Sequence, residues 1–332
     1  MRIFDRKYRL DVLVVVATLA ASAVLLPSDV QAQANWPNRP IKMIVPFDAG
    51  VGNDVIARSL GPKLAARLGQ AVVVENRAGA GGSIGTDAAA KSPPDGNTLL
   101  FVSVGIVTNA ASGKKLPYNI KRDLTSVGQI GTTPLLIVVS NSSGIKTLGE
   151  LINLARAKPF SVNYGSSGVG ATNHIGMELF ATEAKIQLTH VPYKSFATAF
   201  TDLLAGNLQA ALSSLASASK LIQAGKVRAV AVTSLQRSPF MPDLPTATEG
   251  GLPGFQIESW WGMLAPARTP SAVIRRLNEE LNVVVVQPDI REMLERQAAV
   301  PKAGTPEEFA TLISFELERW SKLIKDANIQ ME

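Results

Sequence analysis

Two stretches of the chain share one construction, and together they constrain the fold most strongly. In each, an apolar strand runs into a glycine-rich turn, and a helical pattern begins directly after the turn. The first covers residues 41–54 and the second covers residues 161–173. Glycine lets the backbone approach a ligand closely, and the first turn of a helix leaves N–H groups without partners. One such turn alone is compatible with an ordinary strand-to-helix connection, but two of them predict the two sides of one anion-binding site.

The segment after the first turn alternates between helices and strands. A helical pattern covers residues 55–68, an apolar strand covers 71–75, a second glycine-rich turn covers 76–85, and a strand follows at 98–103. This βαβαβ pattern predicts a doubly wound parallel sheet whose loops gather at the carboxyl ends of the strands. Residues 105–125 are rich in turn-forming residues, and we expect them to be irregular.

A long extended run at residues 124–140 contains Pro134 and predicts a strand that passes from one sheet into another. The strand pattern at 227–234 is expected to return to the first sheet. These two crossings predict two lobes with a hinge and a cleft. Residues 35–133 with 236–332 would form lobe 1, and residues 134–235 would form lobe 2. A strand at 255–264 carries Trp260 and Trp261 on opposite faces, and we expect both in the core or at the hinge.

Residues 1–34 have the pattern of a secretory signal peptide. Four basic side chains precede an apolar run at residues 12–26, and either Ala32-Gln33-Ala34 or Val30-Gln31-Ala32 offers a cleavage site. The apolar run is about 15 residues long, which is short for a membrane span of about 20. The chain has no cysteine, which excludes a lipoprotein anchor. We therefore expect an exported periplasmic protein, with an uncleaved anchor as the alternative.

The composition and motifs argue against several classes of function. The net charge of +6 is spread along the chain without a run of four basic residues, so nucleic acid is not an expected partner. Only two histidines are present, and without cysteine a zinc site is improbable. The nucleophile elbow fails at Val169, and the P-loop and dinucleotide patterns fail as well. We expect no catalytic residue, no metal and no cofactor, structural roles for His174 and His190, and no base beside Ser166 or Ser167.

Many short motifs, in order along the chain, closely resemble the Bug (TctC-like) family of extracytoplasmic solute receptors of tripartite tricarboxylate transporters. They include Trp36-Pro37-Asn38-Arg39-Pro40, Val74-Glu75-Asn76-Arg77, Gly79-Ala80-Gly81-Gly82, Pro94-Asp95-Gly96, Leu116-Pro117-Tyr118, His190-Val191-Pro192-Tyr193-Lys194 and Pro306-Glu307-Glu308-Phe309. The resemblance implies an α/β fold, a two-lobed periplasmic binding protein (type II-like) whose two doubly wound sheets are joined by two crossing strands. It also implies a monomer that closes on a small ligand, usually a carboxylate, and delivers it to a membrane permease.

The resemblance also implies which residues bind the ligand, through backbone N–H groups, hydroxyls and waters rather than through an arginine. The first loop would contribute Phe47, Asp48, Ala49, Gly50, Asn53 and Asp54; the second loop would contribute Ser166, Ser167, Gly168, Thr172 and Asn173; Ser103 and Ser213 would line the side of the cleft.

The departures from the family pattern fall within these loops. Asp48 replaces a usual proline, Val51 replaces a glycine, and Ser213 stands where many relatives carry aspartate. A carboxylate 4 Å from a bound anion would oppose binding by about 4 kcal/mol at an effective dielectric constant near 20. Asp48 therefore faces solvent, or the ligand carries a cationic or amide group, or the charge has been exchanged between Asp48 and Ser213.

Two alternative functions use the same residues. A ligand-sensing periplasmic subunit that signals to a membrane sensor would have the same cleft as a transport receptor. An exported serine hydrolase would use Ser166 or Ser167 as its nucleophile.

Overall fold

The structure is a computed structural model that describes residues 36–50, 52–326 and 329. The predicted signal peptide and Val51 lie outside the described residues. The chain from Arg39 onward is one compact unit, and it contains every helix and strand given below. Among the described residues, no helix is both long enough and apolar enough to cross a membrane.

The strands of the described residues form one ten-stranded sheet in which β4 is the central member. Their bounds are β1 (Ile41–Val45), β2 (Val72–Asn76), β3 (Thr98–Ser103), β4 (Leu124–Ser140), β5 (Asn163–Ser166), β6 (Thr189–Pro192), β7 (Ala210–Ser214), β8 (Val227–Val232), β9 (Glu258–Pro266) and β10 (Val300–Pro301).

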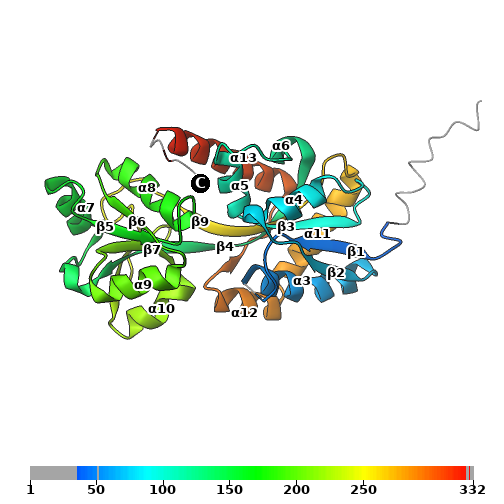
Figure 1. The fold of residues 1–332 in the computed structure, drawn as a ribbon. Helices are drawn as coiled ribbons and strands as arrows, with labels where there is room; N and C mark the ends of the chain where they lie inside the picture. Colours follow the sequence, from blue (N-terminus) through cyan, green and yellow to red (C-terminus); the bar gives the residue numbers. More distant parts are fainter. Residues whose placement is uncertain (1–35, 51, 327–328, 330–332) are drawn as a thin grey trace, which may run out of the picture. The chain divides into compact units, whose positions relative to one another are not determined.

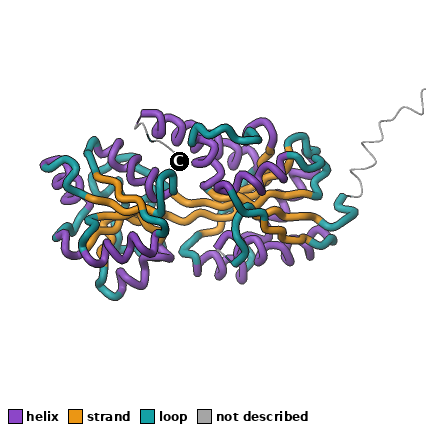
Figure 2. The backbone as a smooth tube through the Cα atoms, viewed as in Figure 1, coloured by secondary structure: helices purple, strands orange, loops and turns teal. Residues whose placement is uncertain are grey.

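Helices cover both faces of this sheet (Figure 1), and Figure 2 separates them by colour from the strands and loops. Their bounds are α3 (Gly52–Leu68), α4 (Ser83–Ala90), α5 (Gly105–Ala111), α6 (Ile120–Asp123), α7 (Leu148–Ala157), α8 (Thr172–Ala184), α9 (Phe196–Ala205), α10 (Leu215–Gln223), α11 (Ser271–Val285), α12 (Pro288–Arg296) and α13 (Pro306–Asp326). Two short 3₁₀ helices cover Ala80–Gly82 and Asn141–Ser143.

The first three strands confirm the βαβαβ prediction. Strand β1 pairs in parallel with both β2 and β3, and four of its five residues are buried. This burial explains the continuous apolar run in the sequence, since a parallel strand covered on both faces has no solvent side. Strands β5, β6 and β7 form a second parallel group, which positions the turn after β5.

Strand β4 connects the two groups of strands. Its residues from Leu124 to Pro134 pair with β9, whereas its residues from Leu135 to Ser140 pair with β7 and β8. The change of partner lies where the sequence predicts the crossing. Thr233 fixes this point, because its hydroxyl receives the Leu135 N–H at 2.9 Å and lies 2.6 Å from the Ile257 carbonyl oxygen.

Three expectations about individual elements were wrong or incomplete. Strand β8 does not return to the first sheet; it pairs with the far half of β4, and β9 makes the return. Residues 105–111 form the helix α5 rather than an irregular segment, because its apolar side packs against α13. The helix α12 and the short strand β10 were not predicted, and both depend on contacts with distant segments.

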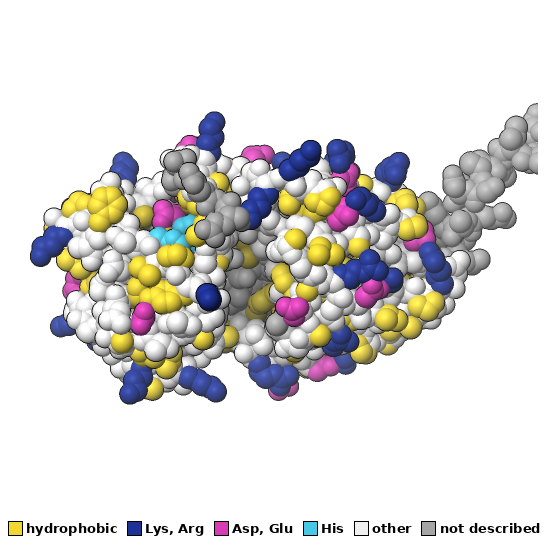
Figure 3. Space-filling view, viewed as in Figure 1, with side chains coloured by type: hydrophobic (Ala, Val, Ile, Leu, Met, Phe, Trp, Pro, Cys, Tyr) yellow, Lys and Arg dark blue, Asp and Glu magenta, His cyan; other side chains and the backbone are white. Residues whose placement is uncertain are grey.

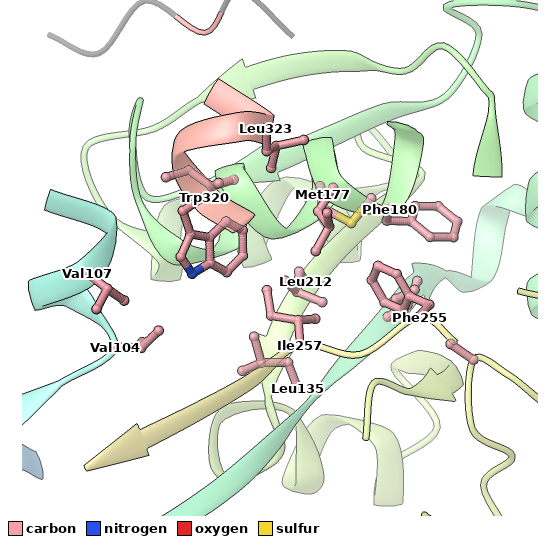
Figure 4. Packing of buried hydrophobic residues seen from close by; sticks show 14 of the residues in the cluster. Val104, Val107, Leu135, Met177, Phe180, Leu212, Phe255, Ile257, Trp320 and Leu323 are labelled. Atoms are coloured by element: carbon pink, nitrogen blue, oxygen red, sulfur yellow. The ribbon is translucent and has the colours of Figure 1, made fainter. Parts of the chain in front are cut away.

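The helix α13 packs against the body of the protein, as the apolar face of its sequence predicts. Figure 4 shows Trp320 and Leu323 of α13 facing Met177 of α8 across a shared core. The sequence Thr305-Pro306-Glu307-Glu308 predicts a capping box at the start of α13, and the structure forms it. The Thr305 N–H donates to Glu308 Oε2 at 2.8 Å, and the Glu308 N–H donates to Thr305 Oγ1 at 3.1 Å.

Candidate functional site

A cavity of about 500 Å³ lies where β4, β7 and β9 meet the starts of α8 and α10. Among the residues that the structure describes, its lining contains hydroxyls, amides and apolar groups but no acidic or basic side chain. The lining residues are Thr133, Leu135, Ser167, Ala171, Thr172, Asn173, Phe196, Leu212, Ser214, Ala216, Ser217, Ser259, Trp261 and Gln297. Three of the predicted site residues, Ser167, Thr172 and Asn173, are among them.

A second cavity of about 510 Å³ has a different character. It lies beside β8 and is lined partly by Lys146, Arg228 and Asp243. Neither of the two glycine-rich stretches contributes to its lining. The neutral cavity at the strand crossing is therefore the better candidate for the predicted site.

The second loop, residues 165–173, brings an open helix N-terminus to the cavity. Ala171 occupies the N-cap position of α8, and its side chain cannot accept a hydrogen bond from the first helical N–H groups. The Asn173 carboxamide oxygen accepts from the Ser167 N–H at 3.2 Å, which folds the loop over the start of the helix. The free N–H groups and the helix dipole favour an anion at this position.

The helix α10 presents a second N-terminus to the same cavity. The Ser214 hydroxyl caps it by accepting the Ser217 N–H at 3.2 Å, and both serines line the cavity together with Ala216. Two helix N-termini and several hydroxyls therefore face one uncharged space, which is an arrangement suited to a carboxylate.

The first loop, residues 46–54, contacts two residues of the cavity lining, Trp261 and Gln297. Trp261 Nε1 donates to Asn53 Oδ1 at 2.7 Å. A Cβ atom built on Gly52 would lie 3.7 Å from Gln297 Oε1, so Gln297 lies close to the start of α3. The sequence prediction that both glycine-rich stretches approach one site agrees with these contacts.

Asp54 has its carboxylate engaged in fixing the first loop. It is buried and accepts hydrogen bonds from the Gly50 N–H at 2.8 Å, Arg58 at 2.9 Å and Asn76 at 2.8 Å. Burial alone would raise its pKa, but these hydrogen bonds together hold the pKa below its ordinary value. Asp54 is therefore ionised at neutral pH, with its charge balanced by Arg58 of α3.

The remaining predicted residues lie outside the cavity lining. Asp48, Ala49 and Gly50 are exposed at the surface, and Phe47 is half-buried. Ser103 and Ser213 are buried, with the Ser213 hydroxyl 3.1 Å from the Ser214 carbonyl oxygen. Ser166 is fully buried, and Gly168 is half-buried in the second loop.

Several lining residues were missed by reasoning from the sequence. Ser214 has a recognisable signal, because a serine between a strand and a helical pattern is a typical N-cap residue. Ser217 follows within the first turn of that helix. Trp261 is buried, in agreement with the expected core or hinge position, but the sequence did not indicate that it also lines the cavity. Gln297 carries no local signal, since only the fold brings it to this position.

The two histidines differ from the sequence expectation in one respect. A base does lie beside a serine of the second loop, because His190 Nε2 is 2.6 Å from Ser166 Oγ. The His174 ring stacks on the His190 ring with 3.9 Å between their centroids. The pKa of both imidazoles is lowered to about 4, mainly by burial and, for His174, also by the neighbouring His190. Ser166 is fully buried and is not placed to attack a substrate in the cavity.

The described residues contain no group of three or more histidine, aspartate or glutamate side chains that could hold a metal ion. Basic side chains are scattered singly among acidic ones on the face drawn in Figure 3.

Comparison with known proteins gives matches along nearly the whole chain. The TctC family, described as tripartite tricarboxylate transporter family receptor, matches residues 56–329. The protein BugT of Bordetella pertussis is 35% identical over 299 residues, which cover 90% of this chain and 92% of that protein.

Two solved structures from Rhodopseudomonas palustris are similar in fold and sequence. Rpa4515, solved with adipate, is 33% identical with a TM-score of 0.73, and the match covers 89% of this chain and 99% of that one. MatC, solved with bound malate, is 30% identical with a TM-score of 0.70, and the match covers 87% of this chain and 100% of that one.

Proposed function

Because the chain belongs to the tripartite tricarboxylate transporter receptor family, we propose that it binds a small organic carboxylate in the neutral cavity and delivers it to a membrane permease. It is a periplasmic solute receptor with the two-lobed α/β fold of periplasmic binding proteins, as its sequence predicts. Its relatives are binding proteins rather than enzymes, which excludes the serine hydrolase alternative.

One observation carries the ligand class: the N-termini of α8 and α10 both open onto an uncharged cavity. Backbone N–H groups and hydroxyls can hold a carboxylate there without a basic side chain. The bound adipate and malate of the two relatives have this chemistry. Because Asp48 is exposed and outside the lining, we propose that the ligand is a plain carboxylate rather than an amide or amino compound.

The proposal includes movement of the two lobes. Residues 35–133 with 236–332 would form one lobe and residues 134–235 the other, and the protein would close on its ligand as a monomer. Strand β4 supports this division, since it changes pairing partners at Pro134 and Leu135. Binding of the closed form to the permease would then deliver the ligand.

The test is thermal unfolding of the mature protein, freed of carried-over ligand by denaturation and refolding. The panel contains dicarboxylates, tricarboxylates, aromatic acids, amino acids and amides. A ligand at a hundred times its dissociation constant adds about 2.7 kcal/mol of stability, or roughly 5 °C for a protein of this size. Stabilisation by plain carboxylates is the expected result. Stabilisation only by amides or amino compounds would show that Asp48 faces the ligand and would overturn the assigned class.

A matched pair of variants tests the cavity itself. Thr172→Val removes a hydroxyl from the lining while keeping the side-chain shape, whereas Thr201→Val makes the same change on the exposed side of α9. We expect Thr172→Val to weaken carboxylate binding about fivefold, since one hydrogen bond contributes about 1 kcal/mol. Equal binding by both variants would place the ligand elsewhere.

A further inference from the structure

We propose that His174 and His190 are positioning residues for the second loop, and that the affinity for ligand depends on both imidazoles being uncharged. This inference rests on the proposed function, because it concerns the regulation of the same cavity. His174 and His190 together form the histidine pair.

The histidine pair supports the backbone of the second loop through hydrogen bonds. The Gly170 N–H donates to His174 Nδ1 at 3.0 Å, so this nitrogen must be unprotonated. His190 Nε2 contacts Ser166 Oγ, and the same hydroxyl accepts the Gly168 N–H at 3.1 Å. Gly168 and Gly170 have φ values of 117° and 81°, so His174 holds one unusual backbone position directly and His190 supports the other through the Ser166 hydroxyl.

Protonation would break this arrangement in two ways. A proton on His174 Nδ1 would turn the acceptor into a donor that faces the Gly170 N–H. Two imidazolium rings whose centroids lie 3.9 Å apart would also repel one another. The loop carries Ala171, Thr172 and Asn173 into the cavity, so its displacement would remove the N-terminus of α8 from the ligand.

The surrounding elements that the structure describes offer no free negative charge that would balance the positive charge of a protonated imidazole. Strands β5 and β7 carry no charged residue, and on β6 only His190 titrates. Each nearby helix carboxylate has another partner: Glu178 of α8 accepts from the hydroxyl of Tyr164, whose ring stacks on both imidazoles, Glu183 of α8 pairs with Arg319 of α13, and Asp202 of α9 accepts from Tyr193.

Burial lowers the pKa of both imidazoles to about 4, which agrees with a pair that is kept neutral. Imidazole atoms reach the surface (cyan in Figure 3), so solvent protons have access to the pair.

The two pKa values set the upper limit of the effect on ligand binding. A rearranged loop that exposes the imidazoles restores their ordinary pKa of about 6.5. Lowering the pH to 5 would then raise the ratio of rearranged to native loop by at most about thirtyfold for each histidine, relative to the same ratio at high pH. We expect the dissociation constant for a bound carboxylate to rise about tenfold between pH 7 and pH 5.

The first experiment compares the wild-type protein with the double variant His174→Asn, His190→Gln by calorimetry with malate and adipate at pH 7 and pH 5. Asparagine keeps an acceptor near the Gly170 N–H, and glutamine keeps a polar atom near Ser166. Titration of the ligand itself affects both proteins equally. We expect the tenfold loss in the wild type and less than a threefold loss in the variant; equal losses would overturn the proposal.

A second experiment does not require a known ligand or a folded variant. The chain has only two histidines, so imidazole NMR of the ¹⁵N-labelled protein reports each pKa directly. We expect both apparent pKa values to lie below the ordinary value of about 6.5, and the Gly170 amide resonance should titrate with His174. A Gly170 amide chemical shift that does not change as His174 titrates would overturn the proposal. Absence of binding by every carboxylate at pH 7, with the Gly170 titration present, would refute the proposed ligand class and leave the histidine pair as the loop support.

Discussion

At the scale of single residues, the hydrogen bond between Trp261 and Asn53 connects the first loop to a wall of the cavity. Trp261 retains about 9% of its exposure and donates its indole N–H to Asn53 Oδ1. Both carboxylate oxygens of the neighbouring Asp54 already accept hydrogen bonds, from Gly50, Arg58 and Asn76, so Asp54 is not free to meet a ligand. Two adjacent polar residues of one predicted motif thus have different roles, which the motif alone does not distinguish.

The contribution of this hydrogen bond can be measured with a double-mutant cycle. Asn53→Ala leaves the partly buried indole N–H without its partner, so the free energy of unfolding should fall by about 1 kcal/mol. Trp261→Phe removes the donor instead. Urea unfolding of both single variants and the double variant should show that the two losses are not additive. Additive losses would indicate that the two side chains act independently.

At the scale of secondary structure elements, local sequence signals placed most helices and strands correctly. The parallel strands β1, β2 and β3 have the apolar runs expected of buried strands, and α13 begins at its predicted capping box. The errors concern elements whose identity depends on partners. The helix α5 is stabilised by packing against α13, and β8 pairs with a strand that precedes it by almost 90 residues.

The capping box of α13 provides a test at this scale. Thr305→Ala removes the acceptor of the Glu308 N–H, so the free energy of unfolding should fall by about 1 kcal/mol. Thr305→Ser keeps the hydroxyl and serves as the control. Chemical denaturation measures both variants; an unchanged stability in Thr305→Ala would mean that the packing of Trp320 and its neighbours alone determines where α13 begins.

At the scale of the whole molecule, the histidine pair couples global stability to pH. Both imidazoles have a pKa of about 4 in the folded protein against an ordinary value of 6.5. The unfolded chain therefore binds protons first as the pH falls, and the stability present above pH 6.5 is lost on the way to pH 4. Glu316 acts in the opposite direction, because burial raises the pKa of its carboxyl group.

We expect the free energy of unfolding to fall by about 2–4 kcal/mol between pH 7 and pH 4.5. This is less than the full shift of two histidines at about 1.4 kcal/mol per pKa unit, because His190 is partly exposed to solvent. Urea unfolding across this range measures the loss. The double variant His174→Asn, His190→Gln should remove most of the pH dependence, and a variant as pH-sensitive as the wild type would assign the effect to other groups.

The sequence by itself determined the α/β fold and the position of the two glycine-rich loops, because strand and helix periodicities and turn residues are local properties. It also placed Ser167, Thr172 and Asn173 in the loop that lines the cavity. Only the tertiary structure brought Trp261 and Gln297 to the same cavity, left Asp48 exposed outside it, and stacked His174 on His190. Those outcomes depend on strand pairing and packing between segments far apart in the chain, which no local pattern encodes.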